Sequence, residues 1–242
     1  MLKVNENKQK RIEVFGYSYD RYALKTPVIT DQDDLDELLR QVVAPQLEKG
    51  DLVFMSEKMV ACTQGRAFPL LAIVPGRLAR LLSRFVTKTP RGIGLGMPET
   101  MQMAIEECGV LRILLAAAVG MLGKLLGRKG WFYRVAGRKA AVIDGPCDYT
   151  LHPYHQYVVL GPQDPQRTAE HCALLLGHPA AIVDINDYGA EILGVWPASV
   201  NRRKLAEILR DNPLGQSDQS TPIGILRPVL KSEIQAEDVS LE

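Results

Sequence analysis

The chain has 242 residues, with 29 Lys and Arg against 28 Asp and Glu, 46% hydrophobic residues and 24% charged residues. This composition is ordinary for a globular protein and excludes the disordered, fibrous and disulfide-scaffold classes. The four cysteines lie far apart and form no CxxC pair, so they predict neither a zinc site nor a disulfide and fit a reducing compartment.

The net charge of +1 hides a strong segregation along the chain. Residues 58–143 carry 14 basic and 3 acidic residues, a net charge of +11, whereas the remainder carries 15 basic and 25 acidic residues, a net charge of −10. Such a basic block favours an anionic ligand, and a solvated surface that pairs with acidic partners is the alternative. Nucleic acid is a poor match, because the basic residues are not interleaved with aromatic side chains that stack on bases.

Two segments bear on localisation. Residues 1–11 are polar and lysine-rich and have no apolar core, so they do not resemble a signal peptide. This segment therefore predicts a cytoplasmic protein. The most apolar run, 113–123, is shorter than the roughly 20 residues that span a bilayer. It therefore predicts a buried helix and no membrane partner, although 113–126 also offers a candidate subunit interface.

In the first third of the chain, apolar spacing predicts a helix over 30–43, with Asp31 and Asp33 in its first turn and Pro45 closing it. The apolar run 52–60 predicts a buried strand pair or one long strand. An amphipathic helix is predicted over 76–86, with Leu78, Leu81, Leu82 and Phe85 facing inward.

In the remainder of the chain, a flexible basic loop at 89–96 leads to a helix from Pro98 to Gly109 and a second helix over about 111–126. A basic, aromatic connector at 127–134 follows. Short strands are predicted over 140–143, 157–160, 180–185 and 223–226. Further helices are predicted over 165–176, capped by Asp164 and stopped by Gly177, and from Asn201 to Leu209.

Several familiar catalytic patterns fail. The run 92–96 lacks the third glycine of a dinucleotide-binding loop, and Gly123-Lys124 is followed by Leu125 instead of Ser or Thr. No GxSxG or HExxH sequence occurs, and His152 and His155 have no further ligand at zinc-like spacing. These absences argue against an NAD enzyme, a serine hydrolase and a zinc protease.

Acidic and amide residues instead follow or precede predicted strands. They are Asp144, Asp148, Asp184, Asp187, Gln216, Asp218 and Gln219. Ligands of open sheets gather at such strand-to-loop exits, and hard oxygen ligands suit Mg²⁺ or Mn²⁺ bridged to phosphate. The alternative is that each residue only forms a turn or caps a helix.

Several segments together resemble one family, the coenzyme F420-0:gamma-glutamyl ligases. The best match is 50–66 (GDLVFMSEKMVACTQGR), with its Gly-Asp, apolar strand and Gly-Arg. The other similar segments are 22–30 (YALKTPVIT), 145–150 (GPCDYT), 158–165 (VVLGPQDP), 181–189 (AIVDINDYG) and the glycine loop and Pro-led strand at 215–227.

The resemblance implies an α+β fold with mixed sheets and packed helices in two interlocked subdomains. It implies a single domain over 12–229 with a basic insert at about 76–139, peripheral tails at 1–11 and 230–242, and a homodimer. It also implies a GTP-dependent ligase that adds L-glutamate, by an amide bond, to a precursor of the deazaflavin coenzyme F420. GTP phosphorylates a substrate carboxylate, and the glutamate amine attacks the acyl phosphate.

The same resemblance implies roles for individual residues. Catalytic positions fall on Asp148, Asp187 and Lys58, and ligands for Mg²⁺ or Mn²⁺ fall on Asp148, Asp187 and Gln216. Nucleotide-contacting positions fall on Lys25, Thr26, Pro27, Val28, Glu57, Lys58, Leu214, Gly215, Gln216, Ser217, Asp218, Gln219 and Ser220.

The chain departs from the family pattern in several ways, three of which are replacements of single residues. Tyr188 replaces a metal-site Thr, Gln216 replaces a metal-binding Glu, and Cys62 stands where a lysine is usual. Lost charges weaken metal and phosphate contacts. Two alternatives therefore stay open: the same chemistry on another acceptor such as a folate, and a non-catalytic phosphate- or nucleotide-binding module.

The basic block is predicted to hold an anionic acceptor, because a phosphate-bearing acceptor and a nucleotide both need compensating charge. The residues assigned to this role are Arg84, Lys88, Arg91 and Arg128.

Overall fold

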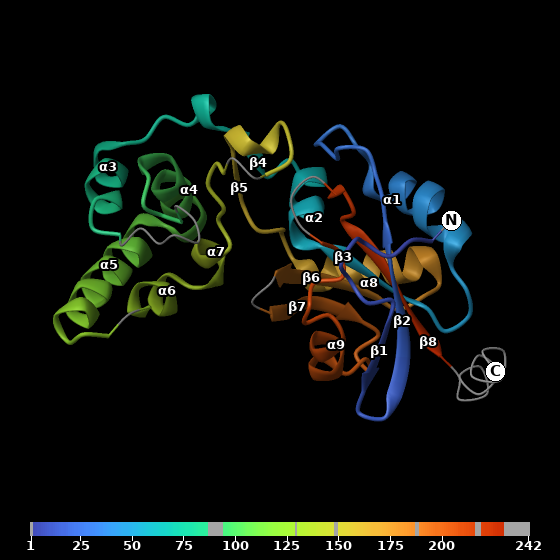
Figure 1. The fold of residues 1–242 in the computed structure, drawn as a ribbon. Helices are drawn as coiled ribbons and strands as arrows, with labels where there is room; N and C mark the ends of the chain where they lie inside the picture. The colour runs from blue at the N-terminus through green and yellow to red at the C-terminus, as the bar shows by residue number, and fades with distance from the viewer. Residues whose placement is uncertain are drawn as a thin grey trace. The chain divides into compact units, whose positions relative to one another are not determined.

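The structure is a computed structural model that describes residues 2–86, 94–128, 130–147, 150–186, 189–215 and 219–229. The chain forms two compact units: unit 1 comprises residues 1–64 and 162–242, and unit 2 comprises residues 65–161 (Figure 1). Helices and mixed strands occur together, which confirms the predicted α+β class. The single domain with a basic insert at about 76–139 stays a prediction.

Unit 1 is built on a six-stranded mixed sheet with strand order β1-β2-β8-β3-β6-β7 (Figure 1). Its strands are β1 (Arg11–Val14), β2 (Tyr17–Leu24), β3 (Leu52–Ser56), β6 (Ala180–Asn186), β7 (Gly189–Trp196) and β8 (Ile223–Val229). Neighbouring strands are antiparallel, except that β3 and β6 run parallel. A parallel pair places the ends of both strands at the same edge of the sheet.

The central strand β3 is apolar because both of its faces are covered. Val53 and Met55 belong to a core with the helix α8 (Pro165–Leu176), whereas Leu52 and Phe54 belong to a second core with the helix α9 (Arg202–Ile208). Strands buried on both faces have continuous apolar sequences. The predictions of a strand at 52–55 and of helices capped by Asp164 and Asn201 are confirmed.

The predicted helix over 30–43 starts too early. α1 (Leu35–Leu38) begins after Asp34, whose side chain accepts a hydrogen bond from Glu37 N, and it continues into a π-helical turn, η1 (Leu39–Val43). Asp33 instead accepts hydrogen bonds from Thr30 N, at 2.7 Å, and Thr30 Oγ1, at 3.0 Å. This local turn competes with helical hydrogen bonding. The chain then closes with a 3₁₀ turn, η2 (Ala44–Gln46), which contains Pro45.

The prediction that the strand continues to Val60 is wrong. The chain leaves β3 at Ser56 and forms the helix α2 (Glu57–Thr63), of which Met59, Val60, Ala61 and Cys62 are buried. A short apolar run has the same hydrophobic pattern in a buried strand and a buried helix, so periodicity alone does not distinguish them.

Unit 2 is mainly helical. Its helices are α3 (Arg77–Ser83), α4 (Pro98–Cys108), α5 (Val110–Leu125), α6 (Trp131–Ala136) and α7 (Arg138–Ala141). Its strands β4 (Ala67–Pro69) and β5 (Tyr157–Val159) form a small antiparallel sheet, flanked by 3₁₀ turns η3 (Leu70–Ala72) and η4 (Tyr154–Gln156). The predicted helices at 76–86, 98–109 and 111–126 are confirmed. The predicted loop at 89–96 falls largely outside the described residues.

Two expectations in unit 2 are wrong. The strand predicted over 140–143 does not form, because residues 138–141 belong to the helix α7. The next β-type contact along the chain is an isolated bridge between Asp144 and Val159. The connector at 127–134 contains the start of α6, because Phe132 and Trp131 pack directly against the bare backbone of Gly120 and Gly123 in α5. Glycines at a helix contact allow such close approach.

The expectation that 113–123 is buried also fails for most of its length. Of α5, only Ile113, Ala116 and Gly123 are buried, and most of its leucines are exposed. Leu81 and Phe85, expected to face inward from the predicted helix 76–86, are exposed as well. Among the described residues, no single helix is both long and apolar enough to cross a membrane. α4 and α5 reach the necessary length and apolar content only when they are taken together, and the chain bends by 119° between them.

Candidate functional site

The predicted nucleotide-binding segments meet at one edge of the unit 1 sheet. The last residue of β2, Leu24, pairs with the first residue of β8, Ile223, and Met55 near the end of β3 pairs with Ile223 from the other side. Ser56, the last residue of β3, pairs with Val183 of the parallel strand β6. The segment after β2, the start of α2 and the loop before β8 therefore all leave the sheet at the same edge.

Backbone hydrogen bonds hold the segment 25–28 against the loop 214–220. Thr26 N donates to Ser220 O at 2.9 Å, and Ser220 Oγ donates back to Thr26 O at 2.8 Å. Ser56 N donates to Pro222 O at 2.8 Å, which attaches the start of α2 to the same loop. Residues separated by almost the whole sequence of unit 1 thus lie together at this edge; we call Thr26, Ser56, Ser220 and Pro222, with the first turn of α2, the rim.

Glu57 and Lys58 supply opposite charges on this rim. Lys58 Nζ lies 3.1 Å from Glu57 Oε1; the Glu57 side chain is 5% exposed and that of Lys58 is 31% exposed. The partly exposed ammonium group can therefore reach an anionic ligand, while the buried carboxylate holds it at the rim. Charge-assisted contacts of this kind are about twice as strong as neutral hydrogen bonds.

Gly215 and Gln219 shape the loop before β8. Gly215 has a φ of +72°, and a Cβ atom on it would lie only 1.5 Å from Gln219 Oε1. The left-handed backbone favours glycine at this position, and the bare backbone leaves room for the Gln219 amide. Gln219 Oε1 is buried and has no hydrogen-bond partner among the residues that the structure describes. A buried amide oxygen of this kind can accept a hydrogen bond from a bound ligand.

Asn5 is a residue of this region that sequence reasoning did not identify. Its side-chain amide donates to Pro213 O at 3.1 Å and to Thr221 Oγ1 at 3.0 Å. Thr221 Oγ1 in turn donates to Leu214 O at 2.6 Å. The segment 1–11 offers no motif that would indicate this contact, because a lone Asn in a polar stretch is uninformative.

The predicted metal ligands Asp148, Asp187 and Gln216 lie outside the described residues, as do Ser217 and Asp218. Within the described part of the chain, no group of three or more His, Cys, Asp or Glu side chains is placed to hold a metal ion. The three metal-ligand assignments therefore stay predictions.

The Asp of the Gly-Asp motif and the Arg of the Gly-Arg motif form hydrogen bonds and ion pairs within their own units. Asp51 is fully buried and forms two hydrogen bonds with Arg227 of β8, at 2.9 Å to Nε and 2.8 Å to Nη2. This pairing raises the pKa of Arg227 and ties the turn before β3 to β8. In unit 2, Arg66 donates to Gly161 O at 2.6 Å and pairs with Glu107 at 2.9 Å.

The structure describes two of the four residues predicted to hold an anionic acceptor. Arg84 and Arg128 are both exposed in unit 2, and Lys88 and Arg91 lie outside the described residues. This assignment also stays a prediction.

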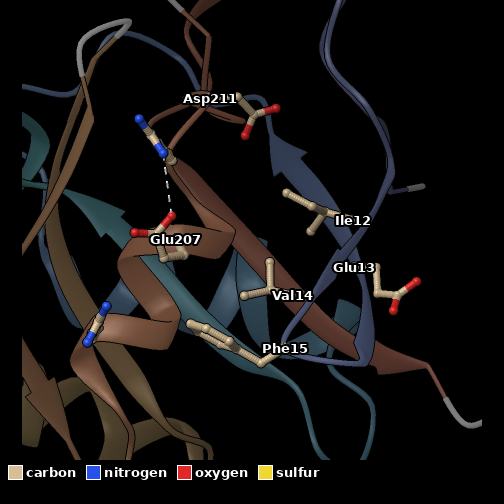
Figure 2. A pocket seen from close by; sticks show the side chains of 8 residues that line it. Ile12, Glu13, Val14, Phe15, Glu207 and Asp211 are labelled. Atoms are coloured by element: carbon tan, nitrogen blue, oxygen red, sulfur yellow. Dashed lines mark ion pairs between the residues drawn. The ribbon is translucent and has the colours of Figure 1, made fainter.

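A cavity of about 670 Å³ lies elsewhere in unit 1, between the β1–β2 hairpin and α9 (Figure 2). It is lined by Ile12, Glu13, Val14, Phe15, Arg203, Glu207, Arg210 and Asp211. Because Phe15 lies just before the start of β2 and Leu24 at its end, this cavity is at the opposite end of the strand from the rim. Two of its charged residues form an ion pair with each other, since Arg210 Nη1 lies 3.7 Å from Glu207 Oε2. It contains none of the predicted nucleotide-binding residues.

The chain matches the model of one protein family. The model of the F420-0:gamma-glutamyl ligase family matches residues 23–176, which include Lys25 to Val28, Glu57, Lys58 and Asp148, while Asp187 and Gln216 follow the matched range. No curated protein matches the chain. Because the matched range exceeds half of the chain, the protein belongs to the F420-0:gamma-glutamyl ligase family, a family of ligases in coenzyme F420 biosynthesis.

Proposed function

We propose that the chain is a GTP-dependent ligase that joins L-glutamate, by an amide bond, to an anionic acceptor, the precursor of coenzyme F420. The observation that carries the proposal is the rim of unit 1. There, Thr26 and Ser220 join two predicted nucleotide segments, and Ser56, two residues before Lys58, donates its backbone N–H to Pro222 of the same loop. Family membership supports the ligase chemistry.

In the proposed reaction, an acceptor carboxylate oxygen attacks the γ-phosphorus of GTP, and the bond to GDP breaks. The amine of L-glutamate then attacks the acyl carbon and loses a proton, an amide bond forms, and phosphate leaves with the electron pair of the broken C–O bond. Lys58 is assigned to the phosphate groups, because its ammonium group is partly exposed and held by Glu57. Catalysis of phosphoryl transfer depends largely on such positioning and charge stabilisation.

A divalent cation, Mg²⁺ or Mn²⁺, is part of the proposal and would neutralise phosphate charge when bound. Asp148, Asp187 and Gln216 are the residues proposed to hold it. Carboxylate and amide oxygens are suitable hard ligands for either ion.

The proposal is tested by incubating the purified chain with the coenzyme precursor, GTP, L-glutamate and Mn²⁺, and by measuring products by mass spectrometry. The expected product is the precursor extended by a glutamyl residue, together with GDP and phosphate. Asp148→Asn and Asp187→Asn should abolish this product, whereas Asp31→Asn, an exposed carboxylate before α1, should not.

Two other outcomes would replace the proposal. A glutamyl product with a folate but not with the coenzyme precursor would assign the same chemistry to another acceptor. Nucleotide binding without turnover of any acceptor would indicate a non-catalytic binding module, the alternative favoured by the departures at Tyr188 and Gln216.

A further inference from the structure

The helix α5 exposes an unusual apolar surface within unit 2. Its polar residues are Arg112 and Lys124, and it contains no acidic residue. Besides Val110 at its first position, the large apolar side chains exposed along it are Leu111, Leu114, Leu115, Met121, Leu122 and Leu125, and these six we call the α5 apolar face. Leu111 and Leu125, near its two ends, are 84% and 80% exposed.

The opposite side of α5 is already used for packing. Ile113, Ala116 and Gly123 are buried, and α6 lies directly against the helix, since Cβ atoms on Gly120 and Gly123 would come within 3.0 Å of Phe132 and Trp131. α5 therefore has two apolar sides, of which unit 2 covers one. An amphipathic surface helix places polar residues on its outer side instead.

The two cations of α5 do not lie on the α5 apolar face. At about 100° per residue, Arg112 and Lys124 fall on the borders between the buried and the exposed side. Arg112 Nε donates to Val135 O at 2.9 Å, and Lys124 Nζ donates to Phe85 O at 2.8 Å. Exposed leucines bordered by cations therefore form the outer surface, and the exposed Phe85 lies beside its C-terminal end.

The charge of the surroundings is strongly positive. Residues 65–161 contain 13 basic and 5 acidic residues, and the helix segments 77–86 and 110–128 contain no acidic residue. One of the few acids of unit 2, Glu107, is paired with Arg66 at 2.9 Å. A surface that combines leucines with a cationic border is complementary to a bilayer whose headgroups are anionic.

We propose that the α5 apolar face binds the surface of an anionic membrane, with α5 lying in the plane of the interface. The helix is about 24 Å long, shorter than the roughly 30 Å hydrocarbon core of a bilayer, so it fits along the interface better than across it. A symmetric contact between two copies would bring two positively charged units together, which disfavours a second copy as the occupant. The proposal departs from the sequence-based expectation of no membrane partner.

The test is co-sedimentation of the full chain with vesicles of phosphatidylcholine alone or of phosphatidylcholine mixed with phosphatidylglycerol. The wild type should sediment with the anionic vesicles, weakly or not at all with the neutral vesicles, and less at high salt. Leu111→Gln/Leu125→Gln should weaken binding to the anionic vesicles by about tenfold or more, because two inserted side chains are lost. Leu174→Gln, a control on α8 that is 69% exposed in unit 1, should bind like the wild type.

Circular dichroism checks that the variants are folded, and Leu115→Gln/Leu122→Gln on the same face serves as the second variant if the first does not fold. The proposal is overturned if the wild type does not bind anionic vesicles, if neutral vesicles bind equally well, or if folded variants bind unchanged. A second copy of the chain would instead be the occupant if the wild type is a dimer, binds no vesicles, and becomes a monomer in the Leu111→Gln/Leu125→Gln variant. That result also overturns the proposal.

Discussion

Asp20 is a buried carboxylate that links β1 and β2. Arg11 donates to it from Nε at 2.7 Å and from Nη2 at 3.1 Å, and Lys10 Nζ lies 3.1 Å away. Burial alone would raise the pKa of Asp20, but the hydrogen bonds from Arg11 and Lys10 prevail, so its pKa is lowered. The ionised carboxylate is therefore the form that stabilises the folded state.

Asp20→Asn should lower the free energy of unfolding at pH 7 by about 1.5–3 kcal/mol, the usual contribution of hydrogen bonds to charged groups. Because the folded pKa is lowered, this stabilisation is complete above the unfolded pKa of about 4 and is lost as the pH falls through the folded pKa. Urea unfolding of both proteins at a series of pH values measures the effect, and the two curves should converge in acid. Glu13→Gln, an exposed carboxylate on β1, is the control; an equal loss in that variant would contradict the assignment.

Individual residues also show what the sequence could reveal about the site. The segment 25–28, the pair Glu57 and Lys58, and the loop 214–220 were predicted as nucleotide contacts from the resemblance, and the described parts of all three meet at one edge of the sheet. Asn5 could not be predicted, because its importance depends on a contact with Pro213 from the other end of the chain.

At the scale of elements, the contact between β3 and β8 depends on one glycine. Gly224 lies opposite Phe54, and a Cβ atom on Gly224 would lie 2.2 Å from Phe54 Cζ. The aromatic ring thus occupies the space that any other residue at position 224 would need.

Gly224→Ala should destabilise the protein by about 1–3 kcal/mol, the usual cost of overpacking a core. Phe54→Leu should restore part of this loss in the double variant, because the shorter side chain leaves room for the new methyl group. Urea unfolding of the four proteins gives the coupling energy of the pair. Strictly additive losses would show that the two residues do not compete for the same space.

Elements with strong local signals were predictable, and elements that depend on tertiary packing were not. α8 carries an Asp164 cap and a Gly177 stop, and it was located from these residues. α2 and α7 were predicted as strands because a few apolar residues in succession fit both structures. β7 was missed because its alternation is interrupted by Gly194, which packs against the backbone of Pro165.

At the scale of the whole molecule, the chain leaves unit 1 after residue 64 and returns at residue 162. The sequence contains no low-complexity linker at either point, so local patterns gave no indication of these boundaries. The charge segregation was a better guide, because most of the basic block belongs to unit 2.

A homodimer is expected from the family resemblance. Light scattering at micromolar concentration should give twice the mass of the 26.8 kDa chain. We expect Leu111→Gln/Leu125→Gln to leave this mass unchanged, since α5 is assigned to a membrane surface. A monomeric wild type would contradict the expectation of a dimer.

The central claim is that the rim of unit 1, with Lys58, binds the nucleotide. Isothermal titration of GTP in the presence of Mn²⁺ tests it most directly, with Lys58→Met compared with Lys49→Met. Both changes remove one ammonium group, but Lys49 is exposed and precedes β3, at the strand end away from the rim. We predict that Lys58→Met weakens GTP binding by about tenfold or more, the effect of losing one charge-assisted contact, while Lys49→Met binds like the wild type. Equal affinities of the two variants, or no heat of GTP binding by the folded wild type, would contradict the claim.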